Sequence, residues 1–105
     1  MKLPLKWEFP GGKIEIGESK EACIVREVKE ELNLSIQVIQ ALTMVSHSYP
    51  DFSLCLYPFI CELIAGDLNP LEHAQVHWVA STELRNYDWA AADIPILEEY
   101  LALEV

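Results

Sequence analysis

Residues 12–34 read GKIEIGESKEACIVREVKEELNL, and this stretch decides the fold of the chain. Its second half is predicted to be an amphipathic helix, because apolar residues recur at intervals of three and four. Ser19 suits the N-cap of this helix, and Asn33 suits its C-cap because Asn tolerates the left-handed conformation. The predicted inner face consists of Ala22, Val25, Val28 and Leu32.

Three carboxylates, those of Glu27, Glu30 and Glu31, lie on the helix face next to this apolar stripe. At about 100° per residue they share roughly one third of the helix circumference. Like charges at this spacing repel one another and destabilise a helix by roughly 0.2–0.5 kcal/mol per pair. Hard oxygen ligands behind a glycine turn are what Mg²⁺ or Mn²⁺ needs. The cluster therefore predicts a divalent metal site, and the alternative is a solvated acidic face.

The composition limits the classes of partner. The chain has 105 residues, 51% of them apolar, which is enough for one domain with a core of its own. Its net charge of −10 argues against binding to a nucleic acid polymer, since such binding needs a basic face. A small phosphorylated substrate stays compatible with this charge, because a bound divalent metal inverts the local field.

The cysteines and the hydropathy indicate a reducing compartment. Cys23, Cys55 and Cys61 form no CxxC pair, and the last two stand in an apolar run, so they are predicted to be core thiols rather than metal ligands. The sequence shows no signal peptide and no apolar stretch near 18 residues. A cytoplasmic protein that does not bind membranes is the expectation.

The rest of the chain predicts an α/β (α+β) fold. Two apolar runs, 36–48 and 52–64, read as strands, and the Tyr-Pro-Asp turn at 49–51 joins them as a hairpin. Pro58 inside the second run indicates an edge position or a bulge. Further elements are expected at 75–79 (a strand), at 81–85 (a short helix capped by Ser81) and at 94–103 (a helix opened by Asp93 and Pro95, with Ile94, Leu97, Tyr100 and Leu101 facing inward).

The stretch 12–34 resembles the signature of the Nudix hydrolase family. The match covers Gly12, Glu18, Arg26, Glu27, Val28, Glu30, Glu31 and Leu34, and it departs at Asn33, where the family has Gly. The lead-in at 7–13, WEFPGGK, looks like the MutT branch of that family. The segment 89–95, WAAADIP, looks like its CTP pyrophosphohydrolase group. The likeness extends over nearly the whole chain.

This resemblance implies a mixed β-sheet sandwiched between helices and a metal-dependent nucleoside triphosphate pyrophosphohydrolase. The enzyme would use Mg²⁺, with Mn²⁺ as a substitute, and would release a nucleoside monophosphate and pyrophosphate. The implied substrates are oxidised or non-standard nucleotides such as 8-oxo-dGTP, in a role of nucleotide pool sanitisation and DNA repair, or CTP-like pyrimidine nucleotides. The alternative is a non-catalytic Nudix-fold fragment that only binds nucleotides.

The resemblance also implies roles for particular residues. The implied metal ligands are Glu27, Glu30, Glu31, Glu72 and the backbone carbonyl of Gly11, the catalytic residues are Arg26, Glu27, Glu30 and Glu72, and the base-contacting residues are Phe9 and Asp93. Each has an ordinary alternative. Arg26 can pair with Glu30 along the helix, Glu72 can be a solvated loop residue, and Asp93 can be a helix N-cap. Glu18 is expected to support the loop and the helix rather than to touch substrate.

The start of the chain departs from the resemblance. MutT-like domains carry a hairpin of the central sheet before the segment equivalent to 7–13, whereas here Met1 stands almost directly before it. We therefore expect residues 1–105 to form one Nudix domain that is incomplete at the N-terminus. Such a domain would have unpaired strand edges, which favour a homo-oligomer or aggregation.

Overall fold

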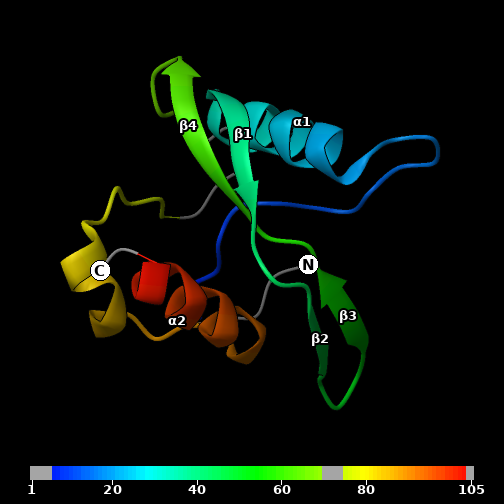
Figure 1. Ribbon diagram of the computed structural model, residues 1–105, viewed down its shortest axis with the longest axis vertical. Helices are drawn as coiled ribbons and strands as arrows, with labels where there is room; N and C mark the ends of the chain where they lie inside the picture. The colour runs from blue at the N-terminus through cyan, green and yellow to red at the C-terminus, as the bar shows by residue number, and fades with distance from the viewer. Residues whose placement is uncertain (1–5, 70–74, 104–105) are drawn as a thin grey trace. The chain divides into compact units, whose positions relative to one another are not determined.

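A computed structural model describes residues 6–69 and 75–103 of the chain (Figure 1). The chain divides into two compact units. The α1 unit consists of Pro10–Gln40 and the described part of Phe59–Trp78. The α2 unit consists of the described parts of Met1–Phe9 and Val79–Val105 together with Ala41–Pro58. Within these residues no helix combines the length and the apolar character that crossing a membrane requires.

Helix α1 (Lys20–Leu32) begins and ends where the sequence predicts. The Ser19 hydroxyl accepts a hydrogen bond from Ala22 N at 3.0 Å, which satisfies one of the free N–H groups of the first turn. Asn33 closes the helix in the left-handed conformation, with φ 62°, and its N–H donates to Lys29 O. Local capping chemistry therefore fixes both ends of the helix that carries the carboxylates.

The C-terminal end of α1 is held by the loop that follows the last strand of its unit. Asn69 N donates to Leu32 O at 2.9 Å, and Asn33 Nδ2 donates to Asp67 O. Gly66 has φ 103°, and a Cβ there would come within 2.5 Å of Asn33 O. Only glycine allows this close approach of two backbones.

The buried face of α1 differs from the predicted stripe. Cys23 and Val28 are buried, whereas Ala22 and Val25 are exposed beside an open apolar groove of about 520 Å³. Cys23 is covered because its Sγ lies 3.7 Å from Gly12 O in the preceding loop. Helical periodicity shows where a helix has an apolar face, but the segments that pack on it decide which side chains are covered.

Each of the two predicted long strands is divided in two. The first gives β1 (Ser35–Ala41) and β2 (Val45–Ser48), and the second gives β3 (Ser53–Leu56) and β4 (Phe59–Ala65). The break in the second run falls at Pro58, which lacks the N–H that a ladder needs, and Leu42 N donates to its carbonyl at 2.9 Å. β1 pairs with β4, and their arrows point in opposite directions in Figure 1.

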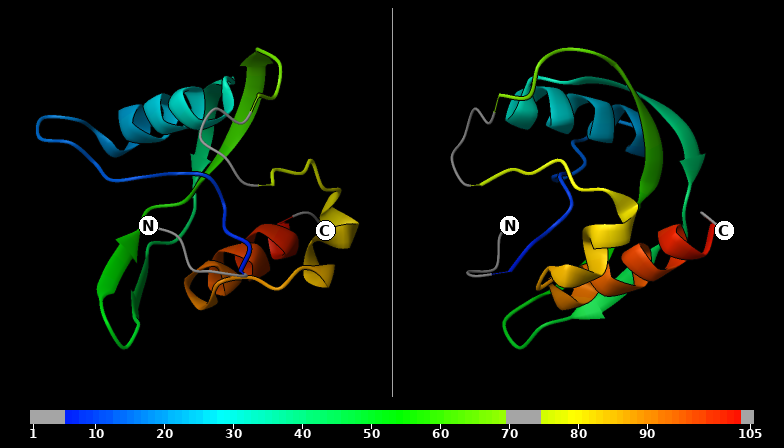
Figure 2. Two further views of the ribbon diagram at one scale, coloured as in Figure 1. Left: turned by 180° about the vertical axis from the view of Figure 1, so that it is seen from behind. Right: turned by 90° about the vertical axis from the view of Figure 1, so that its left-hand side faces the viewer.

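β2 and β3 form an antiparallel hairpin in the α2 unit, as the turn at 49–51 predicts. Val45 stands opposite Leu56, and His47 stands opposite Leu54 on the same, partly buried face. Cys55 lies on the exposed face opposite Ser46, so its prediction as a core thiol is wrong. The hairpin lies next to the start of α2 in both views of Figure 2.

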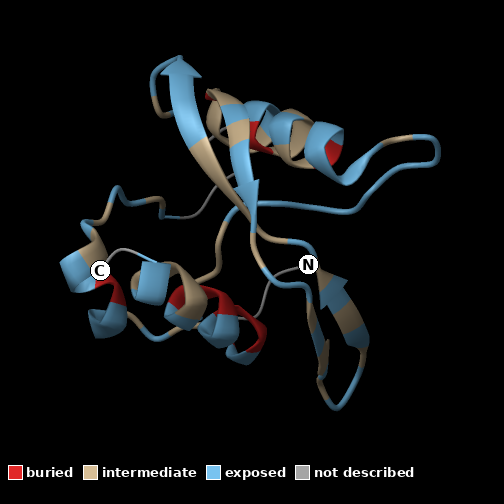
Figure 3. Ribbon diagram, viewed as in Figure 1, coloured by how far each residue is buried: buried red, intermediate tan, exposed pale blue. Residues whose placement is uncertain are grey.

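The helices of the α2 unit are η1 (Ser81–Asn86) and η2 (Ala91–Asp93), both 3₁₀, and α2 (Ile94–Leu103). The final helix agrees with the prediction at 94–103, although Ile94 is exposed rather than inward-facing. Ser81 is not the cap of η1, because the chain turns into the helix one residue earlier, at Ala80. Figure 3 shows the buried residues of this unit on these helices and just before η2, and they are Leu84, Ala90, Ala92, Asp93, Ile96 and Leu97.

The segment 75–79 is not a strand. Its alternating pattern predicts one, yet it forms no strand ladder with any other residue that the structure describes. Trp78 is 68% exposed in this segment. Alternation alone does not make a strand when no partner edge is supplied.

Candidate functional site

The loop before α1 is fixed by a two-pronged ion pair between Glu18 and Arg26. Arg26 Nε lies 2.6 Å from Glu18 Oε2, and Arg26 Nη2 lies 2.9 Å from Oε1. The same carboxylate accepts from Glu15 N, while Arg26 Nη2 also donates to Lys13 O at 3.0 Å. The hydrogen bonds from Arg26 hold the pKa of Glu18 at about 2. This geometry supports the interpretation of Glu18 as an anchor between loop and helix.

The Arg26 guanidinium also holds two of the predicted metal ligands. Its Nη1 lies 2.8 Å from Glu27 Oε1 and 3.2 Å from Glu30 Oε2. The pKa of Arg26 is raised, first by its bonds to Glu18 and then by those to Glu27. One cation therefore fixes carboxylates that would otherwise repel each other, and the pairing of Arg26 with Glu30 is present together with its contact to Glu27.

The Glu27 carboxylate lies directly against the glycine turn. A Cβ built on Gly12 would overlap all three carboxyl atoms of Glu27, so any larger residue would displace this side chain from the turn. The Glu27 side chain is 16% exposed, whereas that of Glu30 is 56% exposed. Gly11 stands on the same turn, one residue earlier. The turn and the helix face thus come together at the Glu27 carboxylate.

The donor chemistry of α1 suits a hard divalent cation, since Glu27, Glu30 and Glu31 offer carboxylate oxygens from one helix. Glu27 and Glu30 are turned toward Arg26, and Glu31 is half-buried. Across 6–69 and 75–103, no three His, Cys, Asp or Glu side chains are arranged as a ready metal site. Glu72 lies outside the described residues.

In the α2 unit, Phe9 and Asp93 come together although 84 positions separate them. Asp93 is 6% exposed, and its Oδ2 accepts a hydrogen bond from Phe9 N at 2.8 Å. The Phe9 ring stacks on Trp89 with ring centroids 4.5 Å apart. Trp7 fixes this pairing, because Trp7 N donates to Asp88 O and Ala90 N donates to Trp7 O, each at 2.9 Å.

Burial makes Asp93 a weaker acid than an ordinary aspartate. Removal from water raises its pKa to about 6, the Glu8 charge adds to this rise, and the Phe9 N–H opposes it. Among the residues that the structure describes, the Phe9 N–H donates a hydrogen bond to this carboxylate, and the acceptor is Oδ2. Near neutral pH, Asp93 can therefore offer its second oxygen either as an acceptor or, when protonated, as a donor.

The structure also adds two residues that the sequence does not single out as functional. Trp89 forms the stacking surface for Phe9, and the Tyr49 hydroxyl accepts a hydrogen bond from Ala92 N at 2.9 Å. Tyr49 reads as a plain turn residue in the sequence. The local sequence shows only a tyrosine in a turn, and this does not reveal which distant residue its hydroxyl will contact.

The predicted site residues therefore fall into two sets. The α1 unit holds Gly11, Arg26, Glu27, Glu30 and Glu31, and the α2 unit holds Phe9 and Asp93.

Comparison with known proteins agrees with this architecture. A family model described as the NUDIX domain matches residues 2–100. The chain is 34% identical over 97 residues to a CTP pyrophosphohydrolase of Escherichia coli (strain K12), covering 92% of this chain and 72% of that protein. It is 32% identical over 92 residues to an 8-oxo-dGTP diphosphatase of the same organism, covering 88% of this chain and 71% of that protein. It is also 32% identical to a protein of Mycobacterium tuberculosis that is named a putative 8-oxo-dGTP diphosphatase, and it spans 66% of that protein's length.

Solved structures give the same result. The solution structure of the E. coli ORF135 protein superposes with a TM-score of 0.81 at 32% identity, covering 94% of this chain and 71% of that one. A MutT structure from a study of Aliivibrio salmonicida and Vibrio cholerae superposes with a TM-score of 0.78 at 33% identity, covering 91% and 78%. The family signature, the fold and these relatives agree, and the chain belongs to the Nudix family of hydrolases.

Proposed function

We propose that this protein is a divalent-metal-dependent nucleoside triphosphate pyrophosphohydrolase. It would convert a nucleoside or deoxynucleoside triphosphate and water into the monophosphate and pyrophosphate. The observation that carries the proposal is the Glu27 carboxylate set against Gly12 and held by Arg26. The names of the relatives support CTP-like pyrimidine nucleotides and 8-oxo-dGTP as candidate substrates.

Glu27, Glu30 and Glu31 are the residues that would hold the metal, together with the Gly11 carbonyl and Glu72. Nudix hydrolases generally use a divalent metal ion, and carboxylate oxygens suit Mg²⁺, with Mn²⁺ as a substitute. When bound, the metal neutralises phosphate charge and makes a coordinated water more acidic.

The protein's own groups would position the reaction and move the proton. Arg26 orients the Glu27 and Glu30 carboxylates through its Nη1, at 2.8 and 3.2 Å. A glutamate within reach of the attacking water would take its proton, and the candidates are Glu27, Glu30 and Glu72. Glu18 would contribute indirectly, because it fixes the guanidinium that holds the other carboxylates.

Phe9 and Asp93 would recognise the base. The ionised Asp93 carboxylate accepts a hydrogen bond, which suits the exocyclic amino group of cytosine. The protonated carboxyl donates one, which suits an acceptor on a modified purine. Because the pKa of Asp93 is about 6, both forms are accessible near neutral pH. Replacement of Asp93 should therefore change the ranking of bases more than the overall rate.

A panel of nucleotides tests the proposal directly. Pyrophosphate release would be measured from CTP, dCTP, 8-oxo-dGTP and dGTP, with and without Mg²⁺. Glu27→Gln should lower turnover by about 10²-fold or more, as loss of a general base or metal ligand does. Glu21→Gln is the matched control, because Glu21 is an exposed glutamate in the first turn of the same helix.

Two outcomes would contradict the proposal. Full activity in a folded Glu27→Gln protein would remove Glu27 from the chemistry. Nucleotide binding without pyrophosphate release from any member of the panel would instead indicate a non-catalytic nucleotide-binding module.

A further inference from the structure

The helical segment that carries Asp93 starts without a cap of its own. The N-cap position of η2 is Ala90, whose side chain has no hydrogen-bond acceptor. Ala90 and Ala92 are each 2% exposed, so water cannot easily reach the first turn. The first N–H groups of a helix have no partner within the helix, and leaving them buried and unpaired is costly. An acceptor from elsewhere in the fold is therefore required.

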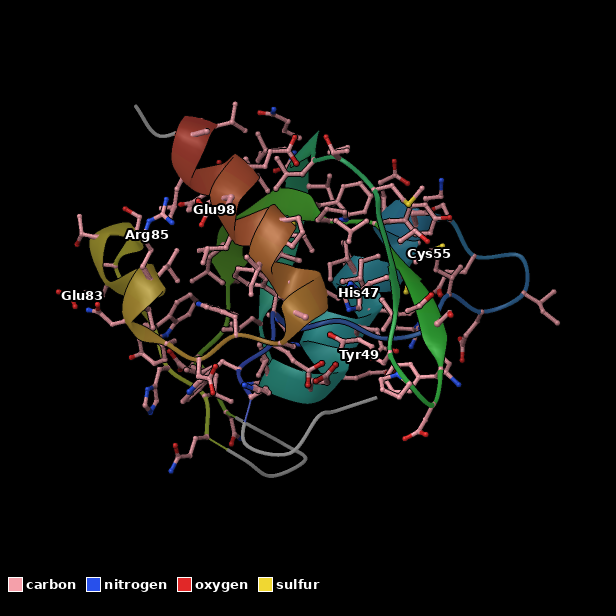
Figure 4. The ribbon with its side chains drawn as sticks, turned by 90° about the horizontal axis from the view of Figure 1, so that it is seen from below. His47, Tyr49, Cys55, Glu83, Arg85 and Glu98 are labelled. Carbon is pink, nitrogen blue, oxygen red and sulfur yellow. The ribbon has the colours of Figure 1, made fainter. Side chains whose placement is uncertain are left out.

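Tyr49 supplies that acceptor from the tip of the β2–β3 hairpin. Its hydroxyl oxygen accepts from Ala92 N at 2.9 Å, across 43 positions of sequence. The ring contacts two aromatic neighbours, His47 with ring centroids 4.5 Å apart and Phe52 with ring centroids 5.0 Å apart. The backbones of Tyr49 and Phe52 also bond to each other in both directions. Figure 4 labels His47 and Tyr49 on this hairpin. Contacts within the hairpin thus hold the Tyr49 side chain independently of its hydrogen bond to η2.

The neighbouring carboxylate has a different partner. An aspartate at the start of a helix often caps the helix with its own side chain, but Asp93 Oδ2 is instead bound to Phe9 N. The Tyr49 hydroxyl holds η2 at Ala92, and the Phe9 N–H holds the next residue, Asp93. The two contacts act on adjacent residues and together fix the direction of the Asp93 side chain.

We propose that Tyr49 is a positioning residue for base selection, whose hydroxyl caps η2 and thereby orients the Asp93 carboxylate. The proposal rests on the proposed function, in which Asp93 contacts the base. Tyr49 itself does not need to touch the nucleotide. Its removal should therefore alter which base is preferred, and not only how stable the protein is.

The same hairpin offers a matched control. Two residues before β2, Thr43 N and Thr43 Oγ1 each donate to the Glu99 carboxylate of α2 at 2.8 Å. Thr43→Val removes one hydroxyl hydrogen bond to the helical segment, as Tyr49→Phe does. The partner of Thr43 is Glu99, which lies six residues after Asp93 in the chain. The two variants share a loss of bonding and differ in whether that bond orients Asp93.

The first measurement is the ratio of kcat/KM for CTP to that for 8-oxo-dGTP in the wild type, Tyr49→Phe, Thr43→Val and Asp93→Ala. Tyr49→Phe should change this ratio by about fivefold, the effect of one hydrogen bond, in the same direction as Asp93→Ala. Thr43→Val should keep the wild-type ratio. An unchanged ratio in Tyr49→Phe, with a changed one in Asp93→Ala, would overturn the proposal.

The second measurement is independent of activity. The titration of the Asp93 carboxyl would be followed by NMR in the protein without nucleotide. Burial raises the pKa of Asp93, and Glu8 is the charged neighbour that adds to the rise. Loosening of η2 in Tyr49→Phe would expose the carboxyl and lower the midpoint, whereas Thr43→Val should leave it in place.

The two measurements separate the two proposals. If Asp93→Ala does not change the base ratio, the assignment of Asp93 to the base fails, and the titration alone then tests the positioning. A lowered midpoint in Tyr49→Phe would still support the cap. An unchanged midpoint would show that Tyr49 does not position Asp93, and the inference would be wrong.

Discussion

Substitution of Gly12 by alanine should separate activity from stability. The new Cβ would overlap the Glu27 carboxyl atoms, so this side chain must rotate away from the turn. A displacement of about 1 Å in a catalytic group costs roughly 10²-fold in rate, which corresponds to about 2.7 kcal/mol in the barrier. We therefore expect Gly12→Ala to lower kcat/KM by about 10²-fold, measured as pyrophosphate release at saturating Mg²⁺.

The same substitution should leave the fold intact. Gly12 does not have a positive φ, so alanine fits its backbone without strain. The reduced freedom of the unfolded chain stabilises the variant by about 0.4–1 kcal/mol. Weakening of the contact between Glu27 and Arg26 offsets this by about 0.5–1.5 kcal/mol, the worth of one hydrogen bond. The melting temperature should shift by less than about 8 °C, since 1 kcal/mol corresponds to about 4–8 °C in a domain of this size.

Two controls make the reasoning refutable. Gly11→Ala should cost much less activity, because its Cβ would make an ordinary 3.7 Å contact with Ile24 Cδ1 and its carbonyl oxygen is retained. In a Glu27→Gln background, Gly12→Ala should have little further effect, because the group that it displaces is already disabled. A Gly12→Ala protein with wild-type turnover, or with a fully additive effect in the double variant, would refute the steric argument.

Three further predictions follow from the same contacts. Glu31→Gln should weaken Mn²⁺ binding at least about tenfold in a calorimetric titration, as removal of a charged ligand does, and equal affinity would remove Glu31 from the metal site. Asp93 has a folded pKa near 6, above its ordinary 3.8, so its contribution to stability is full below about pH 4 and is lost as the pH rises through 6. The difference in unfolding free energy between wild type and Asp93→Asn, from urea melts, should therefore move against the wild type by up to about 3 kcal/mol over that window, and a flat difference would contradict the burial of the carboxyl. Glu18→Gln should speed amide exchange at Glu15, whose N–H donates to Glu18. Because the pKa of Glu18 is held near 2, protection at Glu15 in the wild type should persist above about pH 4.5 and be lost as the pH falls toward 2; exchange that does not change with either the mutation or the pH would show that the loop is held otherwise.

The sequence by itself determined helix α1 and the helix face on which its carboxylates lie. Ser19, Asn33 and the spacing of the glutamates act within one or two turns of the chain, so local capping and periodicity suffice to place them. The family signature has the same local character, because its glycine, arginine and glutamates all stand within residues 12–34. The hairpin turn at 49–51 and the final helix were predictable for the same reason.

Where partners lie far apart in sequence, prediction from the sequence was less successful. The strand breaks near Thr43 and Pro58, the exposure of Cys55 and Ile94, and the absence of a strand at 75–79 all depend on which segments pack together. A periodic pattern states which face of a segment is apolar, but it does not state whether another segment covers that face.

Tertiary structure alone decided the surroundings of Asp93. Its carboxylate is buried and bonded to Phe9, 84 positions away, and the residue before it, Ala92, is bonded to Tyr49. Sequence reasoning left Asp93 as either a cap or a base contact, because one carboxylate can satisfy either role. Both partners, the Phe9 N–H and the Tyr49 hydroxyl, lie far away in the sequence. No local pattern encodes such contacts, because their geometry exists only after the chain has folded.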